Sequence, residues 1–156
     1  MSPEIKIALE SPRQEEVAEM IGKLDQYLNE RYPADTSHVL SIDELDQPDV
    51  RFFVARRDSI AIGCGALRVN KGWGEVKRMF VLPEARGLKI GRLILDRIEE
   101  EARGLGMTCL RLETGPDQPE AIGLYRSVGF VERGPFGDCQ ESPYSVFMEK
   151  VLYASE

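Results

Sequence analysis

Glycines and basic side chains gather where a strand gives way to a helix, a combination that can bind phosphate. The stretch PEARGLKIGRLIL, residues 83–95, holds Gly87 and Gly91, with Arg86, Lys89 and Arg92 around them. The first turn of a helix exposes unpaired N–H groups at the positive end of its dipole. Glycine lets a ligand approach the backbone without meeting a Cβ. The stretch therefore predicts a diphosphate seat, although glycines near a helix start also serve capping or packing.

The charge distribution is consistent with a small anionic ligand held in one place. Residues 68–111 hold ten Lys and Arg against six Asp and Glu, while the rest of the chain holds ten against twenty-one. One face that is simply basic would give the same counts. The net charge of −7 argues against general nucleic-acid binding.

The predicted elements place this stretch between a meander and a later strand–helix pair. Alternation and turn signals predict strands within 4–10, 49–70 (two strands with a tight turn at residues 57–59), 72–83, 107–115, 130–137 and 144–152. Helical periodicity predicts helices within 11–33, 41–47, 84–106 and 117–129. Ser11 is the expected N-cap of the first helix, with Pro12 at its first position, and Ser41 with Glu44 the capping box of the second. The order β-α-α-β-β-β-α-β-α-β-β predicts a mixed α/β sheet with helices on both faces, unlike the strict alternation of a Rossmann domain.

Length and composition favour a single domain over residues 1–156. The three cysteines form no CxxC pair and no Cys/His cluster, so neither a disulfide framework nor a structural metal site is expected. No apolar run approaches the ~20 residues that span a bilayer, and the N-terminus lacks the pattern of a signal peptide. A cytoplasmic protein without membrane association is the expectation.

Two blocks resemble the motifs of the GNAT superfamily of acyl-CoA-dependent N-acyltransferases. The run RGLKIG from Arg86 to Gly91 resembles motif A, Arg/Gln-x-x-Gly-x-Gly/Ala, with Lys89 at the position of its first glycine. The stretch PEAIGLYRSVGFVERG resembles motif B in its Ala-x-x-Leu-Tyr-x-x-x-Gly-Phe spacing. The order of elements is also the family's. The resemblance therefore covers nearly the whole chain and implies a mainly antiparallel sheet of about seven strands with about four helices.

The resemblance implies acetyl-CoA as cosubstrate; from the cysteine and histidine pattern, no metal is expected. The CoA diphosphate would bind the backbone N–H groups of Leu88 to Arg92, and the Lys89 ammonium could contact a CoA phosphate. The pantetheine arm would pair with the free edge of the strand near Met79, as an added strand. Gln118 stands where the family often has an asparagine that contacts the cofactor, and it offers the same donor and acceptor with longer reach. The implied cofactor-binding residues are Met79, Phe80, Val81, Arg86, Gly87, Leu88, Lys89, Ile90, Gly91, Arg92, Gln118 and Tyr125.

Three groups are candidates for catalysis. The attacking amine is mostly protonated at neutral pH, so a base must remove a proton. Glu75 lies eleven residues before Arg86, where family members that use a strand glutamate carry theirs; alternatively it is a solvated strand residue. Tyr125 stands where the family places a hydroxyl near the thioester sulfur, the alternative being a packed aromatic. The Met79 N–H would stabilise the oxyanion that forms on attack.

The family fold places the acceptor pocket between the first helical pair and the last two strands. The candidate lining residues are Tyr32, His38, Trp73, Phe136 and Tyr144. His38, the chain's one histidine, is also explained as a solvated loop residue.

Three functions from different classes remain open. The first is N-acetylation of a small-molecule amine by direct attack in a ternary complex. The second is acetylation of a protein or peptide, which the acidic exterior would suit if the peptide is basic. The third is acyl-CoA binding without catalysis, which the presence of both Glu75 and Tyr125 disfavours. Small members of the family often form dimers, so a homodimer is also compatible.

Overall fold

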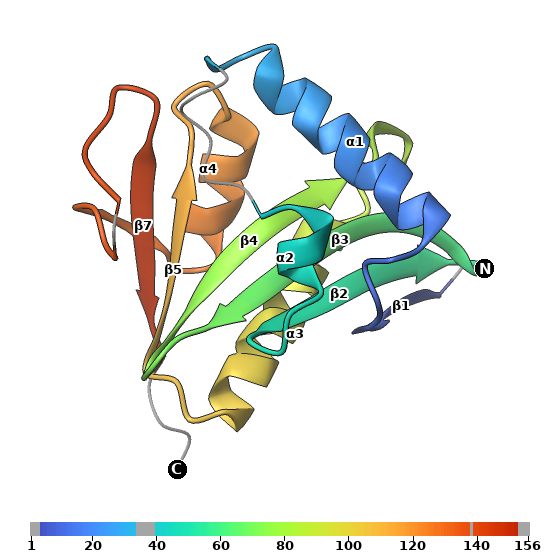
Figure 1. The fold of residues 1–156 in the computed structure, drawn as a ribbon, viewed down its shortest axis with the longest axis horizontal. Helices are drawn as coiled ribbons and strands as arrows, with labels where there is room; N and C mark the ends of the chain where they lie inside the picture. Colours follow the sequence, from blue (N-terminus) through green and yellow to red (C-terminus); the bar gives the residue numbers. More distant parts are fainter. Residues whose placement is uncertain (1–3, 34–39, 138, 153–156) are drawn as a thin grey trace.

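One mixed sheet organises the molecule (Figure 1). A computed structural model describes residues 4–33, 40–137 and 139–152. The strands are β1 (Ile5–Leu9), β2 (Val50–Arg57), β3 (Ile60–Val69), β4 (Trp73–Val81), β5 (Cys109–Thr114), β6 (Val131–Arg133) and β7 (Val146–Val151). They lie in the order β1-β2-β3-β4-β5-β7-β6, and every neighbouring pair is antiparallel except β4 and β5. The predicted mixed, mainly antiparallel sheet is confirmed.

Helices cover both faces of this sheet, as predicted. The helices are α1 (Glu15–Asn29), α2 (Ile42–Leu45), α3 (Ile90–Gly104) and α4 (Pro119–Ser127), with a short 3-10 turn η2 (Pro83–Ala85) before α3. The apolar stripe of α1 and Leu45 of α2 pack in one buried cluster with Phe52, Val54 and Phe80. Side chains of α3 and α4 share a second cluster on the opposite face. Among the described helices, none is long and apolar enough to cross a membrane.

Two short local features, a helix cap and a hairpin turn, are present where the sequence predicts them. The Glu44 N–H donates to Ser41 Oγ at 3.2 Å, and the Ser41 N–H donates to Glu44 Oε1 at 3.2 Å, which confirms the capping box of α2. The tight turn predicted between β2 and β3 is also present. There Asp58 and Ser59 both have positive φ, 51° and 68°, as a two-residue hairpin turn of the primed kind requires.

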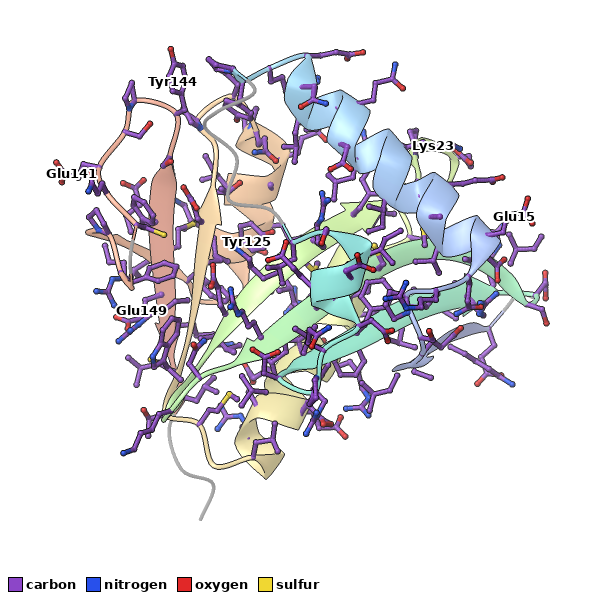
Figure 2. All side chains as sticks on the ribbon, viewed as in Figure 1. Glu15, Lys23, Tyr125, Glu141, Tyr144 and Glu149 are labelled. Atoms are coloured by element: carbon purple, nitrogen blue, oxygen red, sulfur yellow. The ribbon has the colours of Figure 1, made fainter. Side chains whose placement is uncertain are left out.

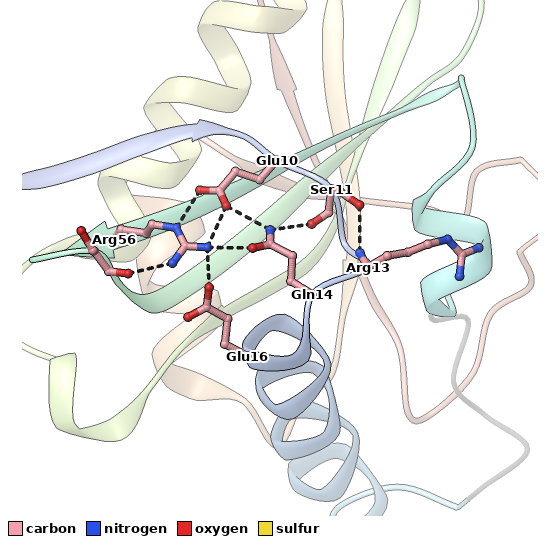
Figure 3. Close-up of polar contacts among 7 residues, drawn as sticks. Glu10, Ser11, Arg13, Gln14, Glu16 and Arg56 are labelled. Atoms are coloured by element: carbon pink, nitrogen blue, oxygen red, sulfur yellow. Dashed lines mark hydrogen bonds and ion pairs between the residues drawn. The ribbon is translucent and has the colours of Figure 1, made fainter.

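The predicted start of the first helix is wrong because a tertiary network determines it (Figure 3). α1 begins at Glu15 rather than Pro12, and its N-cap Gln14 makes no side-chain capping bond. Arg56 of β2 donates to both carboxylate oxygens of Glu10 at 2.8 and 2.9 Å and to Gln14 Oε1 at 3.1 Å. This guanidinium also lowers the pKa of the Glu10 carboxyl. A strand distant in sequence therefore fixes where the chain enters α1.

Candidate active site

The parallel pair β4 and β5 opens a gap in the sheet. The two strands pair only from Trp73 with Cys109 to Val76 with Leu112, and then they diverge (Figure 1). Beyond that point β4 stays paired with β3, and β5 stays paired with β7. Within the described residues, the β5-facing edge of residues 77–81 therefore has no strand partner. Unpaired N–H and C=O groups along such an edge can bind an extended, amide-containing ligand.

A bulge in β4 turns the side chain of Arg78 toward α1, beside the gap between β4 and β5. Lys77 pairs with Ala66 and Phe80 with Cys64, so two residues of β4 stand opposite one of β3. Arg78, inside the bulge, has a φ of 54°. As a result Lys77 and Arg78 both face α1, while the Met79 sulfur packs over Gly65 on the α3 side.

Arg78 is almost fully buried and ties β4 to α1. Its Nε donates to the Leu40 carbonyl at 2.8 Å, and its NH1 atom lies 2.7 Å from Asp25 Oδ1 on α1. The NH1–carboxylate contact is close enough for an ion pair, although its angles do not meet hydrogen-bond geometry. The short distance between Arg78 NH1 and Asp25 Oδ1 and the low exposure of the arginine side chain, 3 %, make this contact an ion pair.

A cavity occupies the space between the diverging strands and α1. Its walls come from α1, β4, the β5–α4 connection, α4 and the segment before β7. Figure 2 labels Tyr125 beside the gap between β4 and β5, and Tyr144 on the segment that leads into β7. The lining residues are Leu24, Leu28, Tyr32, Val76, Lys77, Arg78, Met79, Glu113, Thr114, Gly115, Gln118, Tyr125 and Tyr144.

Tyr32 joins the end of α1 to the β5–α4 connection at this cavity. Its hydroxyl accepts from the Asp117 N–H at 3.2 Å and from Gln118 Nε2 at 3.3 Å. A Cβ at Gly115 would lie 1.8 Å from that hydroxyl, so the ring fits only against glycine. Gln118, predicted to contact the cofactor, thus also positions a predicted acceptor residue.

Tyr125 lines the cavity from α4. It is buried and packs edge-on against Phe130 at a ring-centroid separation of 5.8 Å. Burial raises the pKa of its phenol well above the usual value, so the hydroxyl stays protonated at neutral pH. A protonated hydroxyl in this position can donate a hydrogen bond to a sulfur or oxygen of a ligand.

Glu75 is buried in an ion pair beside the cavity. Its carboxylate lies 3.0 Å from Lys77 Nζ, and the two side chains are 9 % and 10 % exposed. Lys77 lines the cavity, whereas Glu75 is not among the residues that form its wall. A second carboxylate, that of Glu113, does line it.

The structure brings together only part of the predicted acceptor set. Tyr32 and Tyr144 line the cavity, but Trp73 and Phe136 do not. Those two rings stack edge-on at 5.5 Å at the start of β4, where the Arg111 guanidinium lies over Trp73. Phe136 also packs against Phe147 of β7, so the three aromatic rings form a cluster outside the cavity lining. His38 lies outside the described residues.

The predicted phosphate seat is an exposed turn leading into α3. Gly87 and Lys89 have φ values of +91° and 60°, and α3 begins at Ile90. The first main-chain bond of the helix runs from the Leu93 N–H to the Lys89 carbonyl at 3.1 Å. By helix geometry, the N–H groups of residues 90–92 have no acceptor within the helix.

The packing of α3 against α4 requires a glycine at position 91, whereas the motif suggests a role in ligand approach. A Cβ there would lie 2.9 Å from Leu124 Cδ2, so the glycine lets α3 pack against α4. Arg86 NH1, 3.8 Å from Glu120 Oε2, also links the turn before α3 to the start of α4 at the surface. The predicted phosphate seat is thereby held next to α4, the helix that carries Tyr125.

Sequence reasoning missed Glu113, Lys77 and Arg78 as cavity residues. The sequence carries a signal for Glu113, because it follows the buried strand run CLRL, near the end of a strand next to a predicted helix. It carries none for Arg78, whose direction depends on the bulge.

Comparisons with known proteins agree with this geometry. A family model described as "Acetyltransferase (GNAT) family" matches residues 17–130. An "IAA acetyltransferase" from Azospirillum brasilense is 52 % identical over 152 residues, 96 % of this chain and 99 % of that protein. A solved structure described as a "putative acyl-CoA N-acyltransferase" from Klebsiella pneumoniae matches with a TM-score of 0.81 and 34 % identity, over 96 % of this chain and 98 % of the other. The PaiA N-acetyltransferase of Thermoplasma acidophilum, solved with coenzyme A, shares the fold with a TM-score of 0.74 at 20 % identity, over 96 % of this chain and 99 % of the other.

Proposed function

Because the chain belongs to the GNAT family of acetyl-CoA-dependent N-acetyltransferases, we propose that its acceptor is the primary amine of a small metabolite, acetylated by direct attack in a ternary complex. The cavity at the β4–β5 gap carries this proposal. Leu24 and Leu28 of α1 and the buried Tyr32 line one side of it, and the ends of β4 and β5 and α4 line the others. A cavity bounded by side chains of several elements suits a small molecule, whereas a peptide acceptor needs a long open groove.

Acetyl-CoA would bind mainly through the backbone. The pantetheine amides are expected to pair with the free edge of residues 77–81, which has no strand partner among the described residues. The diphosphate would bind the exposed turn and helix start at residues 88–92, with Arg86 and the Lys89 ammonium nearby. The thioester carbonyl would then lie near the Met79 N–H, which can stabilise the oxyanion.

The proton donor for the leaving thiolate is proposed to be Tyr125. It lines the cavity and is protonated at neutral pH. For the proton that leaves the attacking amine, the chain offers two carboxylates, the sequence-predicted Glu75 and the cavity-lining Glu113.

The experiment is a binding measurement followed by a turnover assay. Titration calorimetry with acetyl-CoA is expected to show one binding site per chain. Thiol release is then followed with a panel of small amines, with IAA, the molecule in the relative's name, and with a basic peptide. Turnover on small amines supports the proposal. Turnover on the peptide alone would favour a protein acceptor, and binding without turnover on any acceptor would favour a non-catalytic module.

A further inference from the structure

Resting on the proposed function, we infer that Glu113, rather than Glu75, receives the acceptor's ammonium group and takes its proton. The β4–β5 register ends at Val76 with Leu112, so Lys77 and Glu113 are the first residues past the last pair. Glu113 thus stands at the point where the sheet opens. It lines the same cavity as Met79 and Tyr125, the residues proposed to hold the thioester.

Glu113 projects from the face of the sheet that α1 covers. Residues paired across two strands share a face, so Glu75 and Arg111 lie on one side, and Glu113, two residues further along β5, lies there too. Ser145 Oγ donates a hydrogen bond to Glu113 Oε2 at 2.6 Å. A carboxylate has about four lone-pair sites, so it can accept from Ser145 and from an ammonium group at once. The serine fixes its orientation.

The surroundings of Glu113 combine polar groups with an apolar wall. From β4, Lys77 and Arg78 line the same cavity, and each is ion-paired to a carboxylate, Glu75 at 3.0 Å and Asp25 at 2.7 Å. On the same face of the neighbouring strands, Glu149 holds Arg111 and Arg133, each at 3.0 Å. The side chains of Tyr32, Tyr125 and Tyr144 and those of Leu24 and Leu28 also line the cavity. The expected acceptor is therefore an ammonium on an apolar or aromatic body.

Glu75 has a different role in this arrangement. Its side chain is 9 % exposed, it lies outside the cavity wall, and its carboxylate is engaged by Lys77. We assign it as a positioning residue that holds the Lys77 ammonium in the wall.

The reaction balances with Glu113 as the proton acceptor. An N–H bond of the ammonium breaks, and its proton passes to a Glu113 oxygen and from there to solvent. The freed nitrogen lone pair forms the C–N bond to the thioester carbonyl carbon. The C–S bond then breaks, with its electron pair leaving on sulfur. The second nitrogen proton reaches that sulfur through Tyr125 or water, which gives the amide, the CoA thiol and one released proton.

The test compares Glu113→Gln with Glu75→Gln. Thiol release is measured with acetyl-CoA and phenethylamine, or with the panel amine that the wild-type protein acetylates fastest, from neutral pH toward the pKa of the amine. We expect Glu113→Gln to lower kcat/KM about 10²-fold near neutral pH. The loss should shrink as pH rises, because an increasing fraction of the amine is already neutral. The Kd of acetyl-CoA should stay within about twofold, since that ligand is proposed to bind through the backbone.

Two further variants, together with Glu75→Gln, keep the test decisive. Glu113→Asp retains the carboxylate and should keep the wild-type shape of the pH profile at a lower kcat. Glu75→Gln should lower Tm and change kcat/KM by a factor that does not vary with pH. Glu100→Gln, at an α3 side chain that is 77 % exposed, is the matched control and should behave as wild type.

Two different failures are distinguishable. If the wild-type protein releases thiol and Glu113→Gln retains more than about a third of kcat/KM at neutral pH, the inference is overturned while the proposed function stands. The same holds if the pH-dependent loss appears in Glu75→Gln instead. If Glu113→Gln does not fold, Glu113→Ala takes its place, and retention of more than about a third of kcat/KM at neutral pH overturns the inference. A wild-type protein that acetylates no amine overturns the proposed function, and the inference with it.

Discussion

The proposed phosphate seat and the acceptor cavity are adjacent in space, but backbone groups form the first and side chains form the second. The seat is one contiguous turn and helix start, residues 86–92, and its donors are backbone N–H groups. The cavity takes side chains from α1, β4, β5, α4 and the segment before β7. A backbone site needs a conformation more than particular side chains, whereas a side-chain site depends on how distant elements pack. We therefore expect substitutions to separate cofactor binding from acceptor use.

The largest effect is expected at Tyr125, which lines the cavity and is proposed to contact the thioester sulfur. Tyr125→Phe removes one hydroxyl and keeps the buried ring and its contact with Phe130. If the hydroxyl protonates the leaving thiolate, kcat should fall on the order of 10²-fold. The Kd of acetyl-CoA should change little. A kcat loss of no more than about twofold would remove Tyr125 from the mechanism.

Gly115→Ala should damage the acceptor side more than the cofactor side. The new Cβ would lie 1.8 Å from the Tyr32 hydroxyl, which would have to leave its bonds with Asp117 and Gln118. Overpacking of this kind typically lowers the free energy of unfolding by about 1–3 kcal/mol. The KM for the amine should rise more than the Kd of acetyl-CoA.

Gly123→Ala is the matched control for that change, because no atom lies within 4 Å of its added Cβ in α4. It should leave both constants unchanged and stabilise the helix slightly. Equal effects of Gly115→Ala on the two ligands would show that the regions are not separable.

The smallest effect is expected at Lys89 in the phosphate seat. Its φ of 60° is a left-handed conformation that disfavours a residue with a Cβ by roughly 1–2 kcal/mol. Lys89→Gly should therefore raise the free energy of unfolding by about 1 kcal/mol. It should also raise the KM for acetyl-CoA by a few-fold at low salt and less at high salt, because a phosphate contact is screened.

Lys89→Asn separates the two contributions, because asparagine tolerates the left-handed region and carries no charge. A KM for acetyl-CoA that responds to neither substitution would mean that the backbone alone binds the phosphates.

The sequence predicted those features whose cause is local. The capping box of Ser41 and Glu44 spans four residues, and the turn at Asp58 and Ser59 spans two, so short-range chemistry determines both. The glycine-containing turn before α3 belongs to the same class, although the role of Gly91 in packing against Leu124 could not be read from its motif.

Features that depend on strand register could not be predicted. The start of α1 depends on Arg56, forty-six residues from Glu10. Glu113 enters the cavity because β4 and β5 part after four pairs, and Arg78 does so because of a bulge. Trp73 and Phe136 are aromatic residues of the kind that often line binding sites, but they pack against each other away from the cavity. Such placements follow from tertiary pairing, which residue types alone do not determine.

The gap between β4 and β5 also bears on how the protein persists in a cell. An unpaired strand edge is a template on which another extended chain can add, and so a starting point for aggregation. Acetyl-CoA bound along residues 77–81 would cover that edge and, at 100 times its Kd, would stabilise the native state by about 2.7 kcal/mol. The cosubstrate would then act as a folding ligand too. Protein made in cells depleted of CoA should lose solubility before it loses its intrinsic activity.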